Sequence, residues 1–348
     1  MISLKNRTWH ANKYIDPAES GAVLPILHVN GFKISERTVF GCMDKRELVT
    51  LFTGYGYQVR FIQGLEDIDN DMHTSMVWAI AEIQAIQKAA RSGNPIMKPR
   101  WPLLILMTPK VSPRKMCQPG CKNLICLSKH QGWSAPQKVH GKFIEGSYSS
   151  HQVPLPNVKK DKEELHALQT WLASYDPSDL FTKSGDAVNE IKEIIPRDAK
   201  KMGQRPETYN TYIPPKMPDW KEFTAQKGFL ESSMKHAARL LDRVMVENPR
   251  TVRIFSPDEL ESNKLEYTLA HTGRNFQWDQ FSFAKGGRVI EVLSEHMCQA
   301  FMQGYTLTGR VAVFPSYESF LGIIDTMMVQ YAKFIKMVSS LPLYMCGI

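Results

Sequence analysis

The chain has 348 residues, 43% of them apolar, with a formal net charge of +8 and 21 residues each of glycine and proline. This composition is that of a globular protein and excludes an intrinsically disordered, collagen-like or coiled-coil chain. The apolar run at 101–107 is too short to cross a bilayer, and the first residues carry no apolar signal-peptide core. Six cysteines are too few for a disulfide framework at this length. We therefore expect a cytoplasmic protein with no membrane partner.

The charge excess is concentrated in one segment. Residues 111–131 contain four basic residues and no acidic residue, and they therefore supply half of the net charge. The rest of the chain is only mildly basic, so bulk charge gives little support to nucleic-acid binding. We expect no nucleic-acid partner.

The first part of the chain alternates apolar runs with amphipathic stretches. The spacing predicts, in chain order, a strand at 22–29, a helix at 44–54, a strand at 57–62, a helix at 71–92 and a strand at 103–107. The first run lacks alternation, which indicates a strand covered on both faces. Asp44 is the expected N-cap of the first helix. The spacing of the second helix places along one face Met76, Ile80, Ile83 and Gln87 or Ala90. This order predicts a doubly wound α/β sheet that binds ligands beyond the carboxyl ends of its strands, where Asn30 and Lys110 lie.

The second part of the chain continues this alternation and is interrupted by a proline-rich stretch. A helix expected at 161–175 has its apolar face at Leu165, Leu168 and Leu172. The prolines at 196–218 indicate an irregular interdomain linker. Beyond it, the spacing predicts helices at 229–247, from about 295 and from 318, and strands at 251–255, 288–292 and 310–314. We place the domain boundary near residue 205, which gives domains 1–205 and 206–348.

Polar and aromatic side chains follow several of the expected strands. Glu295 begins a helix after an apolar strand, which suits either a ligand contact or a favourable position near the helix N-terminus. Tyr317 follows another strand and can either stack on a ring or pack in the core. His151 lies in a loop, where both functional and solvated histidines occur. Ser262 and Lys264 can bind a phosphate or form a plain polar loop.

Residues 117–130 contain a spaced set of metal-ligand side chains. Cys117, Cys121, Cys126 and His130 follow a C-x3-C-x4-C-x3-H pattern, which superficially suits a four-ligand zinc site. The spacing matches no common zinc finger or knuckle. A basic zinc protein that binds nucleic acid is therefore the weakest hypothesis, and stoichiometric zinc in the purified protein would support it.

Several longer segments resemble one known enzyme family. They are WHANKYIDPAESGAVLPILHVNGFKISERT, LFTGYGYQV, GKFIEGSYSSHQVPLP, SPDELESNK, RVIEVLSEHMCQ and TGRVAVFPSYESF. Together they are similar to the thiamine-diphosphate-dependent phosphoketolases of the fungal type, over residues 9–110 and 132–337. The resemblance implies parts of two thiamine-diphosphate-binding-type domains with mostly parallel sheets. Residues 1–205 match the later part of the diphosphate-binding domain, and residues 206–348 match the linker and the first part of the pyrimidine-binding domain.

The resemblance also implies a reaction and its partners. Family members are aldehyde-lyases that cleave xylulose 5-phosphate or fructose 6-phosphate with inorganic phosphate, and they release acetyl phosphate and a shortened aldose phosphate. The chemistry comes from thiamine diphosphate, which is bound together with Mg²⁺, while the protein supplies positioning and electrostatics. The expected ligands are therefore a sugar phosphate and inorganic phosphate, and the complete protein is expected to be a homodimer.

Cofactor-binding residues of the family match four positions of this chain. Glu295 matches the acid that hydrogen-bonds the aminopyrimidine ring nitrogen of the cofactor, and Tyr317 matches the aromatic residue that packs on that ring. Asn30 and the main chain of Phe32 match the part of the motif that holds Mg²⁺, a cation that prefers oxygen ligands.

Substrate-binding residues of the family match four further positions. His151 and Lys110 match an active-site pair near the reacting carbons and the phosphate, with His151 also near the phosphate. Ser262 and Lys264 match a phosphate-binding loop. Many relatives have arginine at the position of Lys264, so this chain replaces a bidentate contact by a point charge.

Two segments depart from the family pattern. The insert at 111–131 interrupts sequence that runs on in relatives, and both it and the tail at 338–348 begin with Val-Ser, which the first codons of an intron can encode. We hypothesise that both segments are translated intron sequence, and spliced transcripts that retain the insert would contradict this. We also expect the family's Gly-Asp-Gly motif and the later part of the second domain to be missing.

These observations leave two main hypotheses. The first is an incomplete phosphoketolase whose turnover is weak or absent, because each domain holds only part of the cofactor site. The second is an inactive remnant of the cofactor-binding fold, or an interaction protein. Thiamine diphosphate with Mg²⁺ separates the two, since binding to a working site raises the melting temperature.

Overall fold

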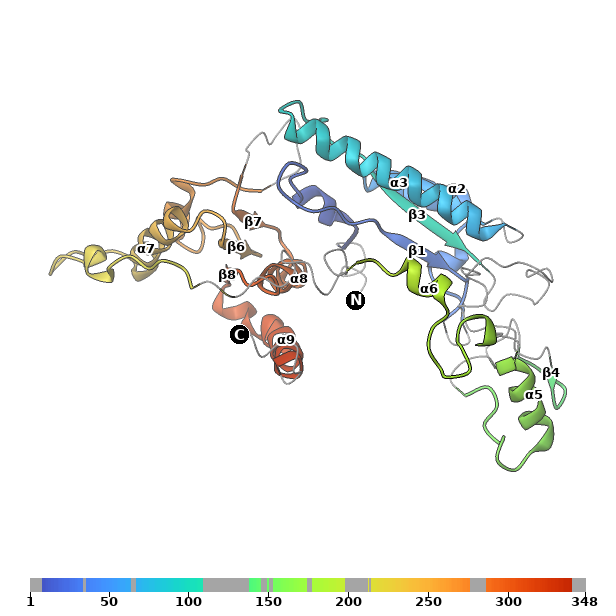
Figure 1. Cartoon of the computed structure of the whole chain (residues 1–348). Coiled ribbons are helices and arrows are strands. Elements are labelled where there is room, and N and C mark those ends of the chain that lie inside the picture. Colours follow the sequence, from blue (N-terminus) through green and yellow to red (C-terminus); the bar gives the residue numbers. More distant parts are fainter. Residues whose placement is uncertain are drawn as a thin grey trace. The chain divides into compact units, whose positions relative to one another are not determined.

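The computed structural model describes residues 8–33, 36–63, 67–108, 138–144, 149, 153–173, 177–197, 212, 214–275 and 286–339. The chain divides into two compact units, and the described residues of each contain a three-stranded parallel sheet (Figure 1). The first sheet unit comprises Val23–Lys88 and Arg100–Ile195, and the second comprises Met1–Ala22, Ala89–Pro99 and Pro196–Ile348. The predicted α/β class is confirmed. The predicted boundary near residue 205 lies outside the described residues.

The sheet of the first unit has the strand order β1-β3-β2. Its strands are β1 (Ile26–Val29), β2 (Tyr57–Ile62) and β3 (Trp101–Met107). β3 is the central strand, and its first six residues are buried. Val29 pairs with Met107 and Ile62 pairs with Leu106, so all three strands end at the same edge.

The strand β1 is less buried than its apolar sequence predicts. Ile26 keeps 45% of its surface exposed, although the run at 22–29 predicts a strand covered on both faces. β1 lies at an edge of the described sheet, where only β3 pairs with it. The prediction was wrong because an apolar run does not distinguish an edge strand from a central one.

Two helices accompany this sheet, α2 (Lys45–Gly54) and α3 (Ile68–Arg91), and Figure 1 shows α3 running along it. α2 begins at the predicted N-cap, since Asp44 accepts a hydrogen bond from the backbone of Glu47 and Glu47 accepts one in return from the backbone of Asp44. In α3 the buried face contains Ala79 and Ile86, whereas Ile80 is 45% exposed. The predicted face is therefore wrong at Ile80, whereas Met76 packs against the core and Ala90 is buried, as predicted. The many apolar residues of this helix permit two adjoining faces, which the spacing alone does not separate.

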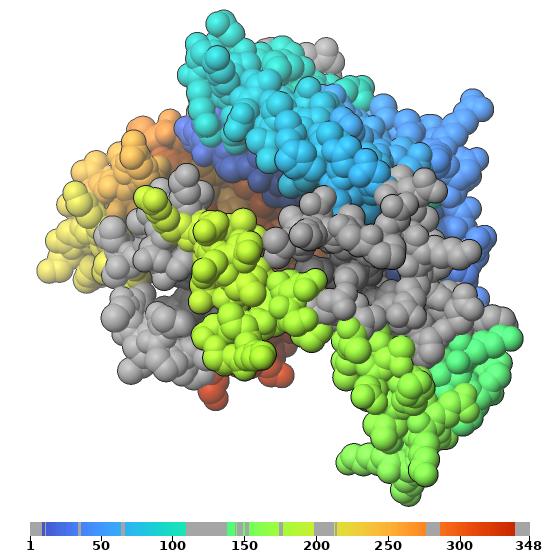
Figure 2. All heavy atoms as spheres, turned by 45° about the vertical axis from the view of Figure 1, so that its right-hand side comes forward, coloured from blue at the N-terminus to red at the C-terminus, as the bar shows by residue number. Residues whose placement is uncertain are grey.

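A small core lies in the later part of the first unit. It joins the hairpin β4 (Lys138–Val139) and β5 (Lys142–Phe143) to α5 (Lys162–Ala173), and Figure 2 shows these green segments side by side. Its buried members are Val139, Ile144, Leu155 and Ala167. The predicted apolar face of α5 was wrong at Leu165 and Leu172, which are 52% and 56% exposed. The face that packs here contains Ala167, Leu168 and Trp171.

The second unit has the strand order β7-β6-β8. Its strands are β6 (Val252–Ser256), β7 (Val289–Glu291) and β8 (Val311–Val313), and its helices are α7 (Ser233–Glu247), α8 (Glu295–Thr306) and α9 (Leu321–Ser339). Strands and helices follow one another as predicted. Phe255, Ile290, Cys298 and Met302 form a buried cluster between the sheet and α8. None of the helices among the described residues is long and apolar enough to span a bilayer.

Shorter helices complete the description. One is α6 (Asn189–Ile194), which precedes the proline-rich stretch. The others are 3-10 turns at Thr8–Tyr14, Phe40–Cys42, Pro177–Asp179, Trp220–Phe223, Glu266–Leu269 and Glu318–Phe320. Residues 214–219 form no helix or strand, as the prolines predict.

Candidate active site

The strands of the second unit all end at one edge of their sheet, because they are parallel. Asp258 follows β6, Glu295 follows β7 and Tyr317 follows β8. The carboxylate of Asp258 accepts a hydrogen bond from the backbone N–H of Tyr317 at 3.4 Å, which joins the segments after two strands. Sequence reasoning misses Asp258, although it stands in the family-like segment SPDELESNK.

Glu295 is the first residue of α8 and is partly buried. The N-cap is Ser294, whose hydroxyl accepts a hydrogen bond from the backbone of Met297 at 3.4 Å. Glu295 is therefore not needed as the cap, although a carboxylate in the first turn still interacts favourably with the helix dipole. This frees its carboxylate for contact with a ligand.

The buried apolar cluster between this sheet and α8 contains the thiol of Cys298. Burial is the main cause that raises the pKa of this thiol to about 12, and the negative charges of Glu295 and Asp258 act in the same direction. Both carboxylates therefore act electrostatically on the same buried group. Cys298 stays a neutral thiol at physiological pH.

The ring of Tyr317 is available at the same edge. Its side chain is 40% exposed and makes an edge-to-face contact with Phe320 at a centroid distance of 6.5 Å. A ring held on one side and open on the other can pack on a planar ligand. Of the two sequence interpretations, the stacking role fits this exposure better than burial in the core.

Ser262 and Lys264 lie on an exposed turn after β6. The hydroxyl of Ser262 donates to the carbonyl of Glu259 at 2.7 Å, and the backbone N–H of Lys264 donates to the carbonyl of Glu261 at 3.0 Å. Lys264 has a positive φ of 60°, which is uncommon for a residue with a side chain. The turn exposes one cationic side chain, which suits a phosphate, but a polar loop explains the same contacts.

The carboxyl edge of the first unit carries the predicted metal-binding residues. The side-chain oxygen of Asn30 accepts a hydrogen bond from the backbone N–H of Phe32 at 3.1 Å. Gly31 between them has φ 85°, a conformation that favours glycine. Gly41 packs so closely that an added Cβ would lie 2.4 Å from the carbonyl oxygen of Gly31. The turn at 30–32 is therefore tightly held.

Two further residues at this edge escape sequence reasoning. Nε2 of His28 lies 2.7 Å from the hydroxyl of Thr108, which follows β3 directly. The backbone N–H of Thr108 donates to the carbonyl of Val29 at 3.3 Å. Burial lowers the pKa of His28, which favours a neutral imidazole. The only available signal is that both residues flank predicted strand ends.

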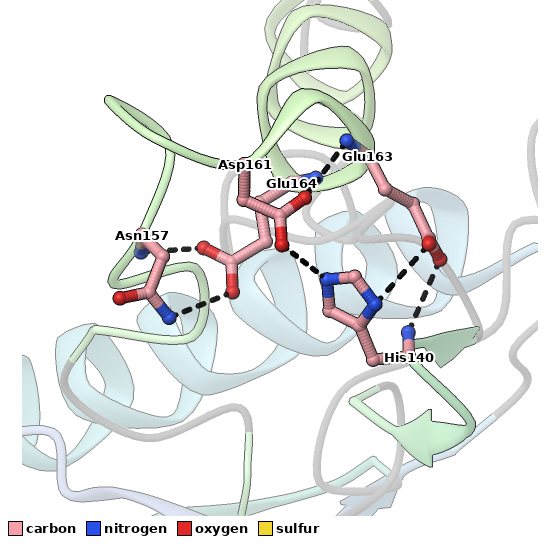
Figure 3. A network of polar contacts seen from close by, with 5 residues as sticks. All are labelled: His140, Asn157, Asp161, Glu163 and Glu164. Carbon is pink, nitrogen blue, oxygen red and sulfur yellow. Dashed lines mark hydrogen bonds and ion pairs between the residues drawn. The ribbon is translucent and has the colours of Figure 1, made fainter.

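A polar cluster joins the hairpin turn to the start of α5 (Figure 3). Ligand atoms of His140, Asp161 and Glu164 lie within 4.8 Å of one another, a spacing that would suit a metal ion. These groups already have partners. Nε2 of His140 lies 2.6 Å from the Asp161 carboxylate and Nδ1 lies 3.2 Å from that of Glu163, while Asn157 donates twice to Glu164. The cluster is a set of hydrogen bonds that fixes the hairpin to α5, and sequence reasoning misses it.

The remaining predicted site residues lie outside the described part of the chain. They are Lys110, His151 and the zinc-like set Cys117, Cys121, Cys126 and His130, together with the rest of the insert at 111–131. Of the tail at 338–348, only the backbone of the first two residues is described, as the end of α9. Predictions for these residues stay predictions.

Two family models match the chain in succession. The model described as the XFP N-terminal domain matches residues 4–213. The model described as D-xylulose 5-phosphate/D-fructose 6-phosphate phosphoketolase matches residues 235–345. The chain belongs to the phosphoketolase family.

Curated relatives in the phosphoketolase family are longer than this chain. A probable phosphoketolase of Schizosaccharomyces pombe is 48% identical over 330 residues, which cover 95% of this chain and 38% of the relative. One of Rhodopseudomonas palustris strain HaA2 is 37% identical over 349 residues, which cover 96% and 42%. The chain thus spans about two fifths of the length of these relatives.

Two solved structures with some likeness to this phosphoketolase-family chain are transketolases. That of Campylobacter jejuni has a TM-score of 0.39 and 16% identity, and the match covers 87% of this chain and 40% of the transketolase. That of Leishmania mexicana has a TM-score of 0.39 and 15% identity, with coverage of 88% and 40%.

Proposed function

We propose that this chain acts in a phosphoketolase that cleaves xylulose 5-phosphate, fructose 6-phosphate or both with inorganic phosphate. The products would be acetyl phosphate and a shortened aldose phosphate. The proposal draws on two successive family matches over most of the chain. The structural observation that supports it most is the presence of Glu295 and Tyr317 at the same carboxyl edge of a parallel sheet.

The cofactors would be thiamine diphosphate and Mg²⁺, and the chemistry of the available groups suits them. Asn30 offers a side-chain amide oxygen and Phe32 a main-chain carbonyl, which are the hard oxygen donors that Mg²⁺ prefers. At the other edge, Glu295 offers a partly buried carboxylate and Tyr317 a partly exposed ring. A carboxylate and an aromatic face together suit a polar heteroaromatic ring. When bound, thiamine diphosphate would supply the nucleophile and electron sink for carbon–carbon cleavage.

The residues of the second unit would then have distinct roles. Glu295 would hold or release a proton at its carboxylate, in hydrogen-bond contact with a ring nitrogen. Tyr317 would pack on the same ring, and Asp258 would position Tyr317 through the backbone hydrogen bond at 3.4 Å. The buried apolar cluster that contains Cys298 would limit the access of water through the protein interior.

Binding of the sugar phosphate and inorganic phosphate would involve Ser262 and Lys264, with His151 and Lys110 near the reacting carbons. Lys264 is exposed on its turn, so its ammonium group can reach a phosphate from solvent. We further propose that the functional protein is a homodimer in the cytoplasm.

Cofactor binding is the direct test of this proposal. The melting temperature of the 348-residue chain should rise when thiamine diphosphate and Mg²⁺ are added together. At a hundredfold excess of ligand over Kd, binding raises the free energy of unfolding by about 2.7 kcal/mol. Glu295→Gln should reduce the shift, while Glu247→Gln on α7 serves as the control. Absence of any shift at millimolar cofactor would favour the inactive remnant or interaction protein.

Turnover is the second readout. Acetyl phosphate can be measured as its hydroxamate after incubation with each ketose phosphate and inorganic phosphate. We expect weak or absent turnover from this chain alone, and readily measurable acetyl phosphate would contradict that expectation. Comparison of the two ketose phosphates would also establish the substrate preference.

A further inference from the structure

Glu291, the last residue of β7, reaches across to the loop that follows β6. Its side chain is 12% exposed, and its Oε1 accepts a hydrogen bond from the backbone N–H of Leu260 at 2.8 Å. Leu260 itself is fully buried. A buried N–H without a partner is costly, so Glu291 supplies an acceptor that this loop needs.

Leu260 is the base of the turn that carries Ser262 and Lys264. Its carbonyl accepts a hydrogen bond from the backbone N–H of Leu265 at 2.8 Å, which closes the turn. Leu265 is 3% exposed and belongs to the same buried cluster as Leu260. Residues 261–264, which are exposed except for the half-buried Asn263, therefore lie between the buried residues Leu260 and Leu265, and the backbone of Leu260 is bonded directly to Glu291.

Arg274 holds the carboxylate of Glu291 from the other side. Its Nε and one terminal nitrogen, the latter at 3.3 Å, contact the two carboxylate oxygens of Glu291. This hydrogen bonding raises the pKa of Arg274. Arg274 is also fixed by its backbone, because it bridges to Val289, and an added Cβ on Gly287 would lie 2.3 Å from its carbonyl oxygen. A partly buried ion pair joined by two hydrogen bonds keeps its geometry better than an exposed ion pair.

The same loop connects to the third strand of the sheet. The hydroxyl of Ser256 donates to the carbonyl of Asp258 at 2.5 Å, and the Asp258 carboxylate accepts from the backbone of Tyr317. Residues 257–265 are thus tied to β7 through Glu291 and to the segment after β8 through Asp258.

We propose that Glu291, oriented by Arg274, is a positioning residue that fixes the loop at 257–265 and thereby places Ser262 and Lys264 for phosphate. Within the described part of the chain, the Glu291 carboxylate bonds to the backbone of Leu260 and to Arg274, and none of these bonds involves the side chain of Ser262 or Lys264. The Ser262 hydroxyl bonds within the loop, to the carbonyl of Glu259, and the Lys264 side chain is exposed. The phosphate part of this inference rests on the proposed function, whereas the positioning of the loop stands on the contacts alone.

The test compares three variants of the full 348-residue chain. Glu291→Ala removes the acceptor for Leu260 and the partner of Arg274, while Glu291→Gln keeps an oxygen acceptor and loses the charge. Glu247→Gln is the control, because Glu247 also pairs with an arginine, Arg243 at 2.8 Å, but on the exposed side of α7.

Amide hydrogen exchange is the first readout. In Glu291→Ala, exchange at 258–265 should rise about tenfold while α8 keeps its protection, with a smaller rise in Glu291→Gln and none in Glu247→Gln. Unchanged exchange in the loop would overturn the proposal. An equal rise over the whole second unit would also overturn it, because that is the signature of a purely structural ion pair.

Titration with inorganic phosphate is the second readout. If the unaltered chain binds phosphate, Glu291→Ala should weaken binding about tenfold and Glu291→Gln should restore part of it. Equal binding by Glu291→Ala would overturn the proposal. If the unaltered chain binds no phosphate, the proposed phosphate site fails, and exchange still decides whether Glu291 positions the loop. Should Glu291→Ala fail to fold, Glu291→Gln provides both measurements.

Discussion

At the carboxyl edge of the first unit, the turn at Asn30 is closed by its own neighbours, whereas the loop after β6 in the second unit is held by side chains from distant segments. Asn30 bonds to Phe32, two residues away, and Gly41 seals the turn by close backbone contact. The loop at 257–265 depends instead on Glu291, which is 31 residues from its partner Leu260. Local changes to the backbone should therefore disrupt the turn at Asn30. The loop at 257–265 should instead be disrupted by the loss of side chains that are distant in sequence.

The two described cysteines lie next to these two edges and give the largest expected contrast. Cys42 follows Gly41 and is exposed, while Cys298 is fully buried with its pKa raised to about 12. At pH 8, iodoacetamide should label Cys42 at least roughly a hundredfold faster than Cys298, because only the thiolate reacts. Peptide mapping by mass spectrometry measures both rates. In urea the two rates should become similar, and native labelling of Cys298 at the rate of Cys42 would show that the second edge is open.

Substitution of Gly41 tests how tightly the first edge is packed. An added Cβ would meet backbone atoms of Gly31 at 2.4 to 2.7 Å, and backbone cannot move aside as a flexible side chain can. Gly41→Ala should therefore lower the free energy of unfolding by about 1–3 kcal/mol. Urea denaturation provides the measurement. The control is Gly54→Ala in α2, where nothing lies within 4 Å of the added atom, and a loss as large there would contradict this explanation.

Removal of the Asn30 side chain tests the local hydrogen bond itself. Asn30→Ala loses the bond to the backbone of Phe32 and should cost about 1 kcal/mol of stability. It should also abolish the part of thiamine diphosphate binding that depends on Mg²⁺. Asn70→Ala is the matched control, since Asn70 is exposed in α3 and its side-chain amide donates to the side chain of Asp67. Cofactor binding that is unaltered by Asn30→Ala would exclude Asn30 as a metal ligand.

The sequence predicts the local features of both edges but not the contacts between segments. Asp44 as an N-cap, β2 at its observed bounds and the start of α8 at Glu295 all depend on short-range signals. The predicted buried faces of α3 and α5 were wrong in part, because Ile80 and Leu165 fit the apolar spacing yet are exposed. The bond from Tyr317 to Asp258 spans 59 residues, so no local pattern reveals it.

The His140 cluster extends the comparison to a contact that is exposed and titratable. The hydrogen bond to Asp161 is the main cause that raises the pKa of His140, with smaller contributions from the charges of Glu163 and Glu164. A folded-state pKa above the ordinary 6.5 means that this contact stabilises the folded chain fully below pH 6.5 and loses its effect as pH rises through the raised value. His140→Gln should therefore reduce protection of the hairpin amides at pH 5.5 more than at pH 8.5, as measured by hydrogen exchange. His73→Gln, on an exposed position of α3, should change neither. An equal loss at both pH values would show that His140 acts through packing. Because the contact is open to solvent, we expect the effect of His140→Gln to be the smallest of those described.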